Sequence, residues 1–444
     1  MSVVPGGSVL SPVDPSIYSW RQSSLSPSQW NRLALSNECM WASRPKDLRE
    51  LFICTLIAPE SPIARSALTS AASRAWQILR FQVPELSADA TCTEDGAAYM
   101  QYQTPQSQVE VDAWVDRTSH FETGRGMLNF KELKAKVLSR KREHDSDKTF
   151  LLLYSQTARD SRDDRVEHVQ VMLYADHQVM DGTGLKILLG KYLSLLASAL
   201  PNPGEIQKVD IHWSKSYKNL SLPWILHMND NQVVSGSDYE EIVTWNQNII
   251  LNKLACTSYQ TNSSSSSLMT SQKLNPGLPL NQDIHEAQPA SQETHFLALS
   301  QSKTSAILQA IKNILGLSSN ITHLCHAAIV LALLRASPSS STTSATQTLY
   351  SPCWLNGRRY LKPTTKCLSP NAEYIPICLS FAPVTFENLT QLALSSTATR
   401  DEIREKLLKA CRVATEQYMS VRERKSMLPE CVNLFEDIGR MMIL

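Results

Sequence analysis

The sequence predicts an α/β architecture with mixed β-sheets flanked by helices, and two observations support this. Short apolar runs suited to strands alternate with longer segments of helical periodicity in both halves of the chain. The chain has 444 residues, more than an average domain, so two lobes with separate cores are expected. The motifs G-x-S-x-G, G-x-x-x-x-G-K-S/T and G-x-G-x-x-G are absent, which leaves α/β-hydrolase, P-loop and Rossmann folds without their signatures.

The composition favours a small-molecule partner. There are 43 Lys and Arg against 42 Asp and Glu, a formal net charge of +1, and no long run of one sign. We therefore expect no nucleic-acid partner and no membrane partner. None of the ten cysteines has the two-residue spacing of zinc or redox sites, and no apolar run reaches the roughly 18 residues of a membrane span. A cytoplasmic monomer with reduced thiols and no bound cofactor or metal is expected.

In the first half, periodicity predicts one long helix, several strands and a hairpin. Apolar residues at helical spacing predict a helix between Ser61 and Pro84. The polar segment Ala97–Trp114, with interspersed aromatic and valine residues, favours short strands. Phe150–Tyr154 and Val169–Ala175 are apolar runs separated by a charged loop, which is typical of a hairpin of two buried strands.

The hairpin leads into an amphipathic helix and then a long connection. Leucines recur at helical spacing up to Leu200, with Thr183 as the expected N-cap and Pro201 as the stop. The following residues lose periodicity and include the serine tract Ser263–Ser267. Within this connection Leu222–Trp224 is expected to dock on a lobe. The predicted organisation is an N-terminal lobe over 1–205, a connection over 206–292 and a C-terminal lobe over 293–444.

The C-terminal lobe is predicted to alternate strands and helices. We expect a strand at His295–Leu299, a helix over Lys303–Leu315 closed by Gly316, and a buried helix over Thr322–Ala336. Strands are expected over Leu349–Tyr360, broken at Asn356-Gly357, and over Tyr374–Val384, broken at Pro376; a long charged helix should cover Asp401–Arg422.

The strongest functional signal is the hexapeptide His177-Gln-Val-Met-Asp-Gly182 between the hairpin and its helix. A neutral imidazole placed where a strand gives way to a helix is suited to removing the proton of an attacking alcohol. Asp181 could hold the turn through an ion pair or cap the helix, while Gly182 admits a backbone conformation that a side chain would disfavour. The alternative is a histidine that only stabilises the turn.

Four segments carry a resemblance to a known superfamily: Tyr174–Gly184 (YADHQVMDGTG), Trp76-x-x-Leu-Arg80, Gly316–Leu334 (GLSSNITHLCHAAIVLALL) and Leu355–Leu361 (LNGRRYL). The chain resembles the condensation-type acyltransferases, which include chloramphenicol acetyltransferase, the plant BAHD enzymes and peptide-synthetase condensation domains. Among these it is most similar to fungal O-acyltransferases of secondary metabolism. The plant Asp-Phe-Gly-Trp signature is absent, and Asp437-Ile-Gly-Arg440 is only a faint counterpart.

The resemblance implies a two-lobed chloramphenicol acetyltransferase-like fold with a tunnel between the lobes. Acyl-CoA as co-substrate and a small alcohol, a terpenoid or polyketide, would meet there at His177, the general base. The motif aspartate of the family pairs with an arginine, so Asp181 would be structural. Arg358 or Arg359 is its candidate partner, and Arg358 is favoured because it follows the Asn-Gly turn. Because family members usually continue beyond the position of Leu444, a shortened C-terminal lobe is expected. The alternatives are a carrier-protein-dependent condensation-like transferase and an inactive homologue that only binds ligand.

Two further histidines have the spacing of a possible metal site. His323 and His326 lie three residues apart on a predicted helix, a spacing compatible with metal binding. Their apolar neighbours favour core packing instead.

Overall fold

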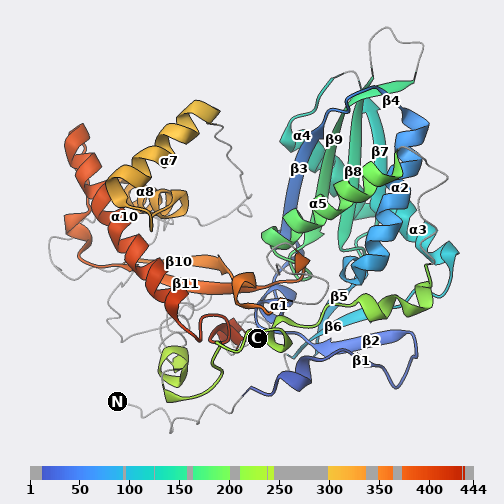
Figure 1. Cartoon of the computed structure of the whole chain (residues 1–444), viewed down its shortest axis with the longest axis horizontal. Helices are drawn as coiled ribbons and strands as arrows, with labels where there is room; N and C mark the ends of the chain where they lie inside the picture. The colour runs from blue at the N-terminus through green and yellow to red at the C-terminus, as the bar shows by residue number, and fades with distance from the viewer. Residues whose placement is uncertain are drawn as a thin grey trace, which may run out of the picture. The chain divides into compact units, whose positions relative to one another are not determined.

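The computed structural model describes residues 13–93, 97–124, 126–157, 164–200, 211–237, 239–244, 299–336, 349–363, 373–432 and 434–435 (Figure 1). Its chain forms two compact units that interleave in sequence: residues 1–252, 356–380 and 428–444, and residues 253–355 with 381–427. The predicted lobe boundaries stay a prediction. The serine tract, residues 295–298 of the expected strand and residues 437–444 lie outside the described ranges. Within those ranges no helix is both long and apolar enough to cross a membrane.

The first unit combines two sheets with helices that include α1 to α5. Its strands are β1 (Arg21–Gln22), β2 (Gln29–Leu33), β3 (Glu50–Ile57), β4 (Ile63–Ala64), β5 (Asp89–Cys92), β6 (Ala98–Gln103), β7 (Ser119–Gly124), β8 (Thr149–Thr157) and β9 (Arg165–Asp176). Its helices are α1 (Asn37–Ala42), α2 (Arg65–Gln82), α3 (Gln108–Thr118), α4 (Phe130–Glu143) and α5 (Gly182–Ala199). The predicted helix before Pro84 and the predicted helix after His177 are both confirmed, as α2 and α5.

The larger sheet is mixed, as predicted. Its strand order is β3-β9-β8-β7, with β4 also on β9. The β8–β9 hairpin and the β3–β9 pair are antiparallel, whereas β7 and β8 run parallel. The smaller sheet, β1-β2-β6-β5, is antiparallel throughout.

Alternation along β8 and β9 explains how helices cover both faces of the larger sheet. Successive strand residues point to opposite faces. Leu151 and Leu173 join a core with α2 and α5, while Leu152 and Met172 join a second core with Leu133 and Val137 of α4. In Figure 1, α2 and α5 lie over one face of this sheet and α4 lies behind it. The turn after β9 therefore leaves a sheet that is packed on both sides.

The prediction of strands over Ala97–Trp114 is half wrong. Residues 98–103 form β6, but Val109, Val111 and Trp114 lie on α3. The Ser107 hydroxyl caps α3 by accepting a hydrogen bond from the Glu110 amide, and Val111, Trp114 and Val115 are the buried apolar residues of its inner face. A cap followed by apolar residues three and four apart stabilises a helix even where valine and tryptophan have high strand propensity.

The second unit contains α7 (Gln301–Leu315), α8 (Ile321–Ala336), β10 (Leu349–Asn356), most of β11 (Leu379–Phe386) and α10 (Arg400–Glu423). All three predicted helices and the Gly316 stop are confirmed; Gly316 has φ 89°. The predicted burial of α8 is wrong, since Ile329 is 57% exposed. Only one side of α8, with Ala327, Val330 and Leu331, is buried against neighbouring helices such as α10.

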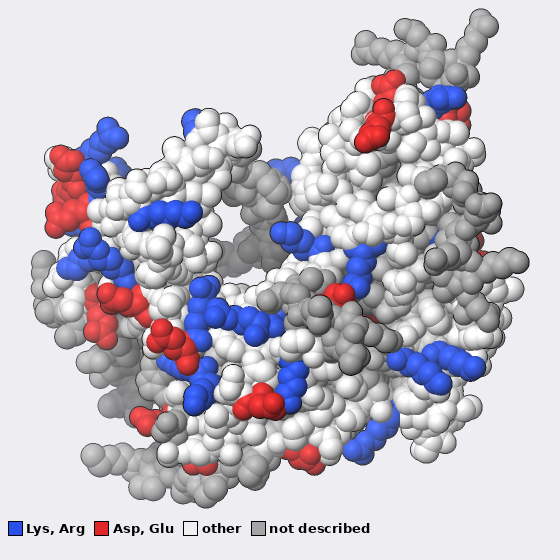
Figure 2. Space-filling model, in the orientation of Figure 1, with Lys and Arg blue, Asp and Glu red and all other residues white. Residues whose placement is uncertain are grey.

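Figure 2 shows basic and acidic side chains interspersed on the face that it presents. This agrees with the near-zero net charge of the sequence.

Candidate active site

The hexapeptide forms a tight turn between β9, which ends at Asp176, and α5, which begins at Gly182. His177 is the first residue after the strand, and its amide donates a 2.7 Å hydrogen bond to the Arg49 carbonyl, just before β3. The Val179 amide closes the turn onto the Asp176 carbonyl at 3.1 Å. The backbone of His177 is therefore fixed from the neighbouring strand as well as from its own turn.

The His177 imidazole lies half-buried against an aromatic ring. The Trp41 indole stacks on it, with ring centroids 3.9 Å apart and planes 13° apart. Burial lowers the pKa of His177 below its ordinary 6.5, and the Asp181 carboxylate partly opposes this. Its Nδ1 is buried without a hydrogen-bond partner among the described residues. The ring is consequently neutral at physiological pH, which is the form that accepts a proton.

Asp181 is fully buried and forms three structural hydrogen bonds. Its Oδ1 accepts from the Gly184 amide at 2.8 Å, which makes it the N-cap of α5. Its Oδ2 accepts from the Cys378 amide and from Arg358 Nη1, both at 2.9 Å. The N-cap is thus Asp181 and not the predicted Thr183, because an aspartate carboxylate can cap a helix and pair with a cation at the same time.

Arg358, not Arg359, is the partner of Asp181. Its side chain is fully buried and also donates to the carbonyls of Tyr374 at 2.6 Å and Pro376 at 2.8 Å. The strand predicted from Tyr374 instead begins at Leu379, and the guanidinium binds the carbonyls of the irregular segment before it. Arg359 is exposed, with its guanidinium carbon 5.3 Å from the Tyr360 ring centroid.

The glycine that the turn requires is Gly184 and not Gly182. A Cβ on Gly182 would meet nothing within 4 Å, and its backbone φ is not positive. A Cβ on Gly184 would come within 2.0 Å of the Ile375 carbonyl oxygen. The close approach of α5 to the segment held by Arg358 therefore depends on Gly184. The sequence prediction named Gly182 for this role, although Gly184 lies in the same motif.

Sequence reasoning also missed the residues that hold the turn from the side of β3. The Arg49 guanidinium donates to Gln178 Oε1 at 2.7 Å and lies 3.4 Å from Asp176 Oδ1. Gln178 Nε2 donates to Asp89 Oδ1 at 2.8 Å. No motif marks Arg49 or Trp41, whereas Gln178 could have been suspected because it directly follows the histidine.

Comparison with known proteins identifies the family. The family model described as 15-O-acetyltransferase Tri3 matches residues 10–436. The chain belongs to the Tri3 family.

Similar proteins agree with this membership. Trichothecene 15-O-acetyltransferase TRI3 of Fusarium sporotrichioides is 24% identical over 423 residues, covering 93% of this chain and 75% of that protein. Trichothecene O-acetyltransferase TRI3 of Trichoderma arundinaceum is 22% identical over 399 residues, covering 86% and 70%. The solved structure of the Fusarium enzyme has a TM-score of 0.74 and 22% identity, and the match covers 99% of this chain and 81% of that one. The predicted chloramphenicol acetyltransferase-like fold is confirmed.

Membership in the Tri3 family also confirms the predicted enzyme class. The chain is an O-acyltransferase of the fungal secondary-metabolite type, and an acyl-CoA and an alcohol are the substrates that such an activity implies.

His323 and His326, the two histidines with metal-compatible spacing, lie in the second unit among hydroxyl groups. In this Tri3-family chain, His326 Nδ1 lies 3.1 Å from the Tyr418 hydroxyl and Nε2 lies 2.6 Å from the Ser351 hydroxyl. His323 Nδ1 lies 3.1 Å from the Thr415 hydroxyl and its ring stacks on Tyr418. Three of the four ring nitrogens therefore have hydroxyl partners within the second unit.

Proposed function

We propose that this chain transfers an acetyl group from acetyl-CoA to a hydroxyl group of a trichothecene or a related fungal terpenoid, with His177 as the general base. The observation that carries the proposal is the half-buried imidazole, held at the end of β9 with a lowered pKa. The names of the similar proteins, which are trichothecene O-acetyltransferases, support the choice of acceptor.

The proposed reaction uses the His177 ring twice, first as the neutral base and then, once protonated, as the acid. The imidazole takes the hydroxyl proton as the acceptor oxygen attacks the thioester carbonyl, and the C–O bond forms. The tetrahedral intermediate then expels the CoA thiolate, which receives the proton from the imidazolium. The products are the acetate ester and CoA thiol, and His177 returns to its neutral form. Asp181 and Arg358 hold the turn and take no proton in this scheme.

Replacing His177 tests the proposal. His177→Ala should lower kcat by about 10²- to 10⁴-fold, the usual contribution of a general base, while the fold remains. Transfer is measured with acetyl-CoA and a trichothecene that carries a free 15-hydroxyl, by release of CoA thiol and by the mass of the ester. His168→Ala is the matched control, because His168 is an exposed histidine on the same strand. Undiminished turnover in His177→Ala would exclude the proposed role.

The pH dependence provides a second check on the same group. A base must be neutral to act, and burial lowers the pKa of His177. The acid limb of kcat/KM should therefore lie below pH 6.5, with activity retained at neutral pH and lost as the pH falls through the lowered pKa. An acid limb above 6.5 would contradict the assignment.

We further propose that the protein acts as a cytoplasmic monomer. Its mass by light scattering and the distribution of a tagged chain between cell fractions test these two points. Acetyl-CoA and an acetylated carrier protein offered together would show which donor is consumed.

A further inference from the structure

Trp41 lies on α1, a six-residue helix between β2 and β3, and presents its indole face to the imidazole of His177. An isolated helix of this length is not stable in water, so contacts outside it must hold it in place. The Trp41 side chain is itself buried, at 9% exposure. How α1 is held therefore decides how firmly the stack is fixed.

The start of α1 is fixed by a strained residue and two long-range hydrogen bonds. Ser36, the residue before the helix, has φ 54° and ψ −117°, a conformation that residues with a side chain rarely adopt. Its hydroxyl donates to the Cys431 carbonyl at 3.2 Å, and Asn37 Nδ2 donates to the Leu379 carbonyl at 2.9 Å. Strain that persists because its surroundings enforce it is a feature of functional sites.

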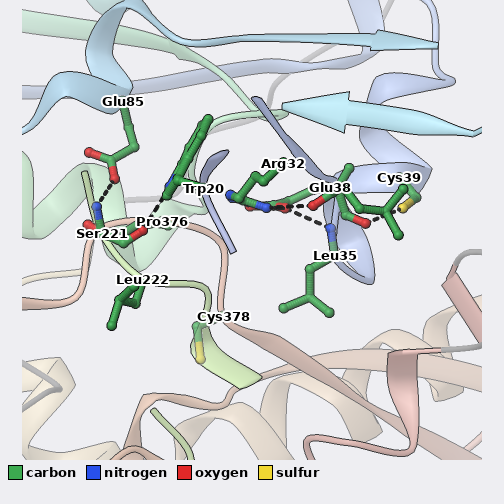
Figure 3. A network of polar contacts seen from close by, with 12 residues as sticks. Trp20, Arg32, Leu35, Glu38, Cys39, Glu85, Ser221, Leu222, Pro376 and Cys378 are labelled. Atoms are coloured by element: carbon green, nitrogen blue, oxygen red, sulfur yellow. Dashed lines mark hydrogen bonds and ion pairs between the residues drawn. The ribbon is translucent and has the colours of Figure 1, made fainter. Parts of the chain in front are cut away.

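A buried ion pair fixes the same segment from the other side. Figure 3 shows Arg32 between Trp20 and Glu38. The guanidinium makes two hydrogen bonds to the Glu38 carboxylate, at 2.7 and 2.6 Å, and Glu38 Oε2 also accepts from the Leu35 amide at 2.8 Å. The Arg32 and Glu38 side chains are only 3% and 6% exposed. Such a paired fork restricts geometry more than it stabilises the fold.

The Trp41 ring carries one further contact. The Arg44 guanidinium carbon lies 5.0 Å from the Trp41 ring centroid, within the range of a cation–π interaction. Arg44 and Asp181 are the charged groups that act on the His177 ring, with opposite signs, and the Arg49–Asp176 ion pair holds the adjoining backbone. The stack thus lies between a fixed helix and a fixed turn.

We propose that Trp41 is a positioning residue for His177: its indole face holds the imidazole in one plane and keeps water from that side of the ring. This proposal rests on the proposed function of His177 as the base. An imidazole without the indole rotates about its side-chain bonds and gains hydration. Proton abstraction then becomes slower because the ring spends less time in the reactive orientation.

The test compares Trp41→Leu, which removes the aromatic face, with Trp41→Phe, which keeps one. Both are made in the full chain and assayed with acetyl-CoA and the 15-hydroxyl trichothecene. We expect Trp41→Leu to lower kcat about 10- to 100-fold, to change the KM for acetyl-CoA by less than about 3-fold, and to move the acid limb of kcat/KM to higher pH. Trp41→Phe should recover most of the loss.

A matched control removes a stack elsewhere in the same unit. Trp30 stacks on Tyr217 with centroids 4.2 Å apart and planes 12° apart, and Trp30→Leu should leave kcat and the acid limb unchanged. Equal effects of Trp30→Leu and Trp41→Leu would overturn the proposal, because any lost stack would then suffice.

A direct readout separates this inference from the proposed function. NMR titration of the His177 ring reports its pKa without turnover, and loss of the indole should raise that pKa because hydration of the cation improves. An unchanged pKa and an unchanged kcat in Trp41→Leu would overturn the inference, even if His177→Ala is inactive. A fall in kcat/KM that comes entirely from a higher KM, with the His177 pKa unchanged, would also overturn the inference. If Trp41→Leu does not fold, Trp41→Phe must show a smaller shift in the same direction, and no shift overturns the proposal.

Discussion

His177 in the first unit and His326 in the second are both withdrawn from solvent, and burial lowers the pKa of each. Their ring nitrogens are used differently. Both nitrogens of His326 face hydroxyl groups, whereas Nδ1 of His177 has no hydrogen-bond partner in the described part of the chain and the ring is held by stacking. Hydrogen bonds at both nitrogens fix a histidine for packing, while a stack fixes the ring and leaves proton transfer open.

The surroundings differ in the same way. The carboxylate of Asp181, four residues after His177, binds the turn and its neighbours Gly184, Cys378 and Arg358. Around His326 the polar groups bind the ring itself. A buried histidine is therefore better judged by what its nitrogens contact than by its spacing to other histidines.

The largest expected effect breaks the support of the His177 turn. Asp181→Ala leaves the Arg358 guanidinium buried without its counter-charge, which costs about 3–5 kcal/mol of the free energy of unfolding. Stability and kcat should fall together, since the turn that orients His177 loosens. Thermal melting and transfer assays on the same preparation measure both, and lost activity at an unchanged melting temperature would instead indicate a direct catalytic role for Asp181.

A smaller effect is expected from filling the space between Gly184 of α5 and the Ile375 carbonyl. Gly184→Ala places a Cβ 2.0 Å from the Ile375 carbonyl oxygen, so the segment held by Arg358 must shift, at a cost of about 3 kcal/mol. Gly182→Ala is the control, because its Cβ would enter open space and alanine favours helices by up to about 1 kcal/mol. Chemical denaturation compares the two variants. Equal free energies of unfolding would refute the claim that Gly184, and not Gly182, is required by the close approach to Ile375.

The smallest effect on stability is expected for a change at His326, and it tests whether His326 differs in function from His177. His326→Phe leaves the Tyr418 and Ser351 hydroxyls without the imidazole, at a cost of about 2 kcal/mol in stability. The transfer rate per folded molecule should stay at the wild-type value, as measured by kcat corrected for the folded fraction at a temperature well below melting. A loss of kcat as large as that of Asp181→Ala would mean that the two histidine environments are not functionally distinct.

Much of the fold could be predicted because local patterns decide local structure. The apolar spacing of α2 and α5, the β8–β9 hairpin and the Gly316 stop needed only neighbouring residues. The prediction failed at α3, where the Ser107 cap outweighed strand propensity, and at α8, where an apolar circumference did not mean burial on all sides. Burial depends on which elements pack around a helix, and that is not a local property.

For this protein the sequence by itself determined the histidine, the aspartate four residues later, and the strand–turn–helix that presents them, because all three depend on short-range spacing. The tertiary structure decided which arginine pairs with Asp181, which glycine admits the neighbouring segment, and that Trp41 stacks on His177. Those contacts join residues far apart in the chain, and only the packing of the folded units brings such groups within hydrogen-bond or stacking distance.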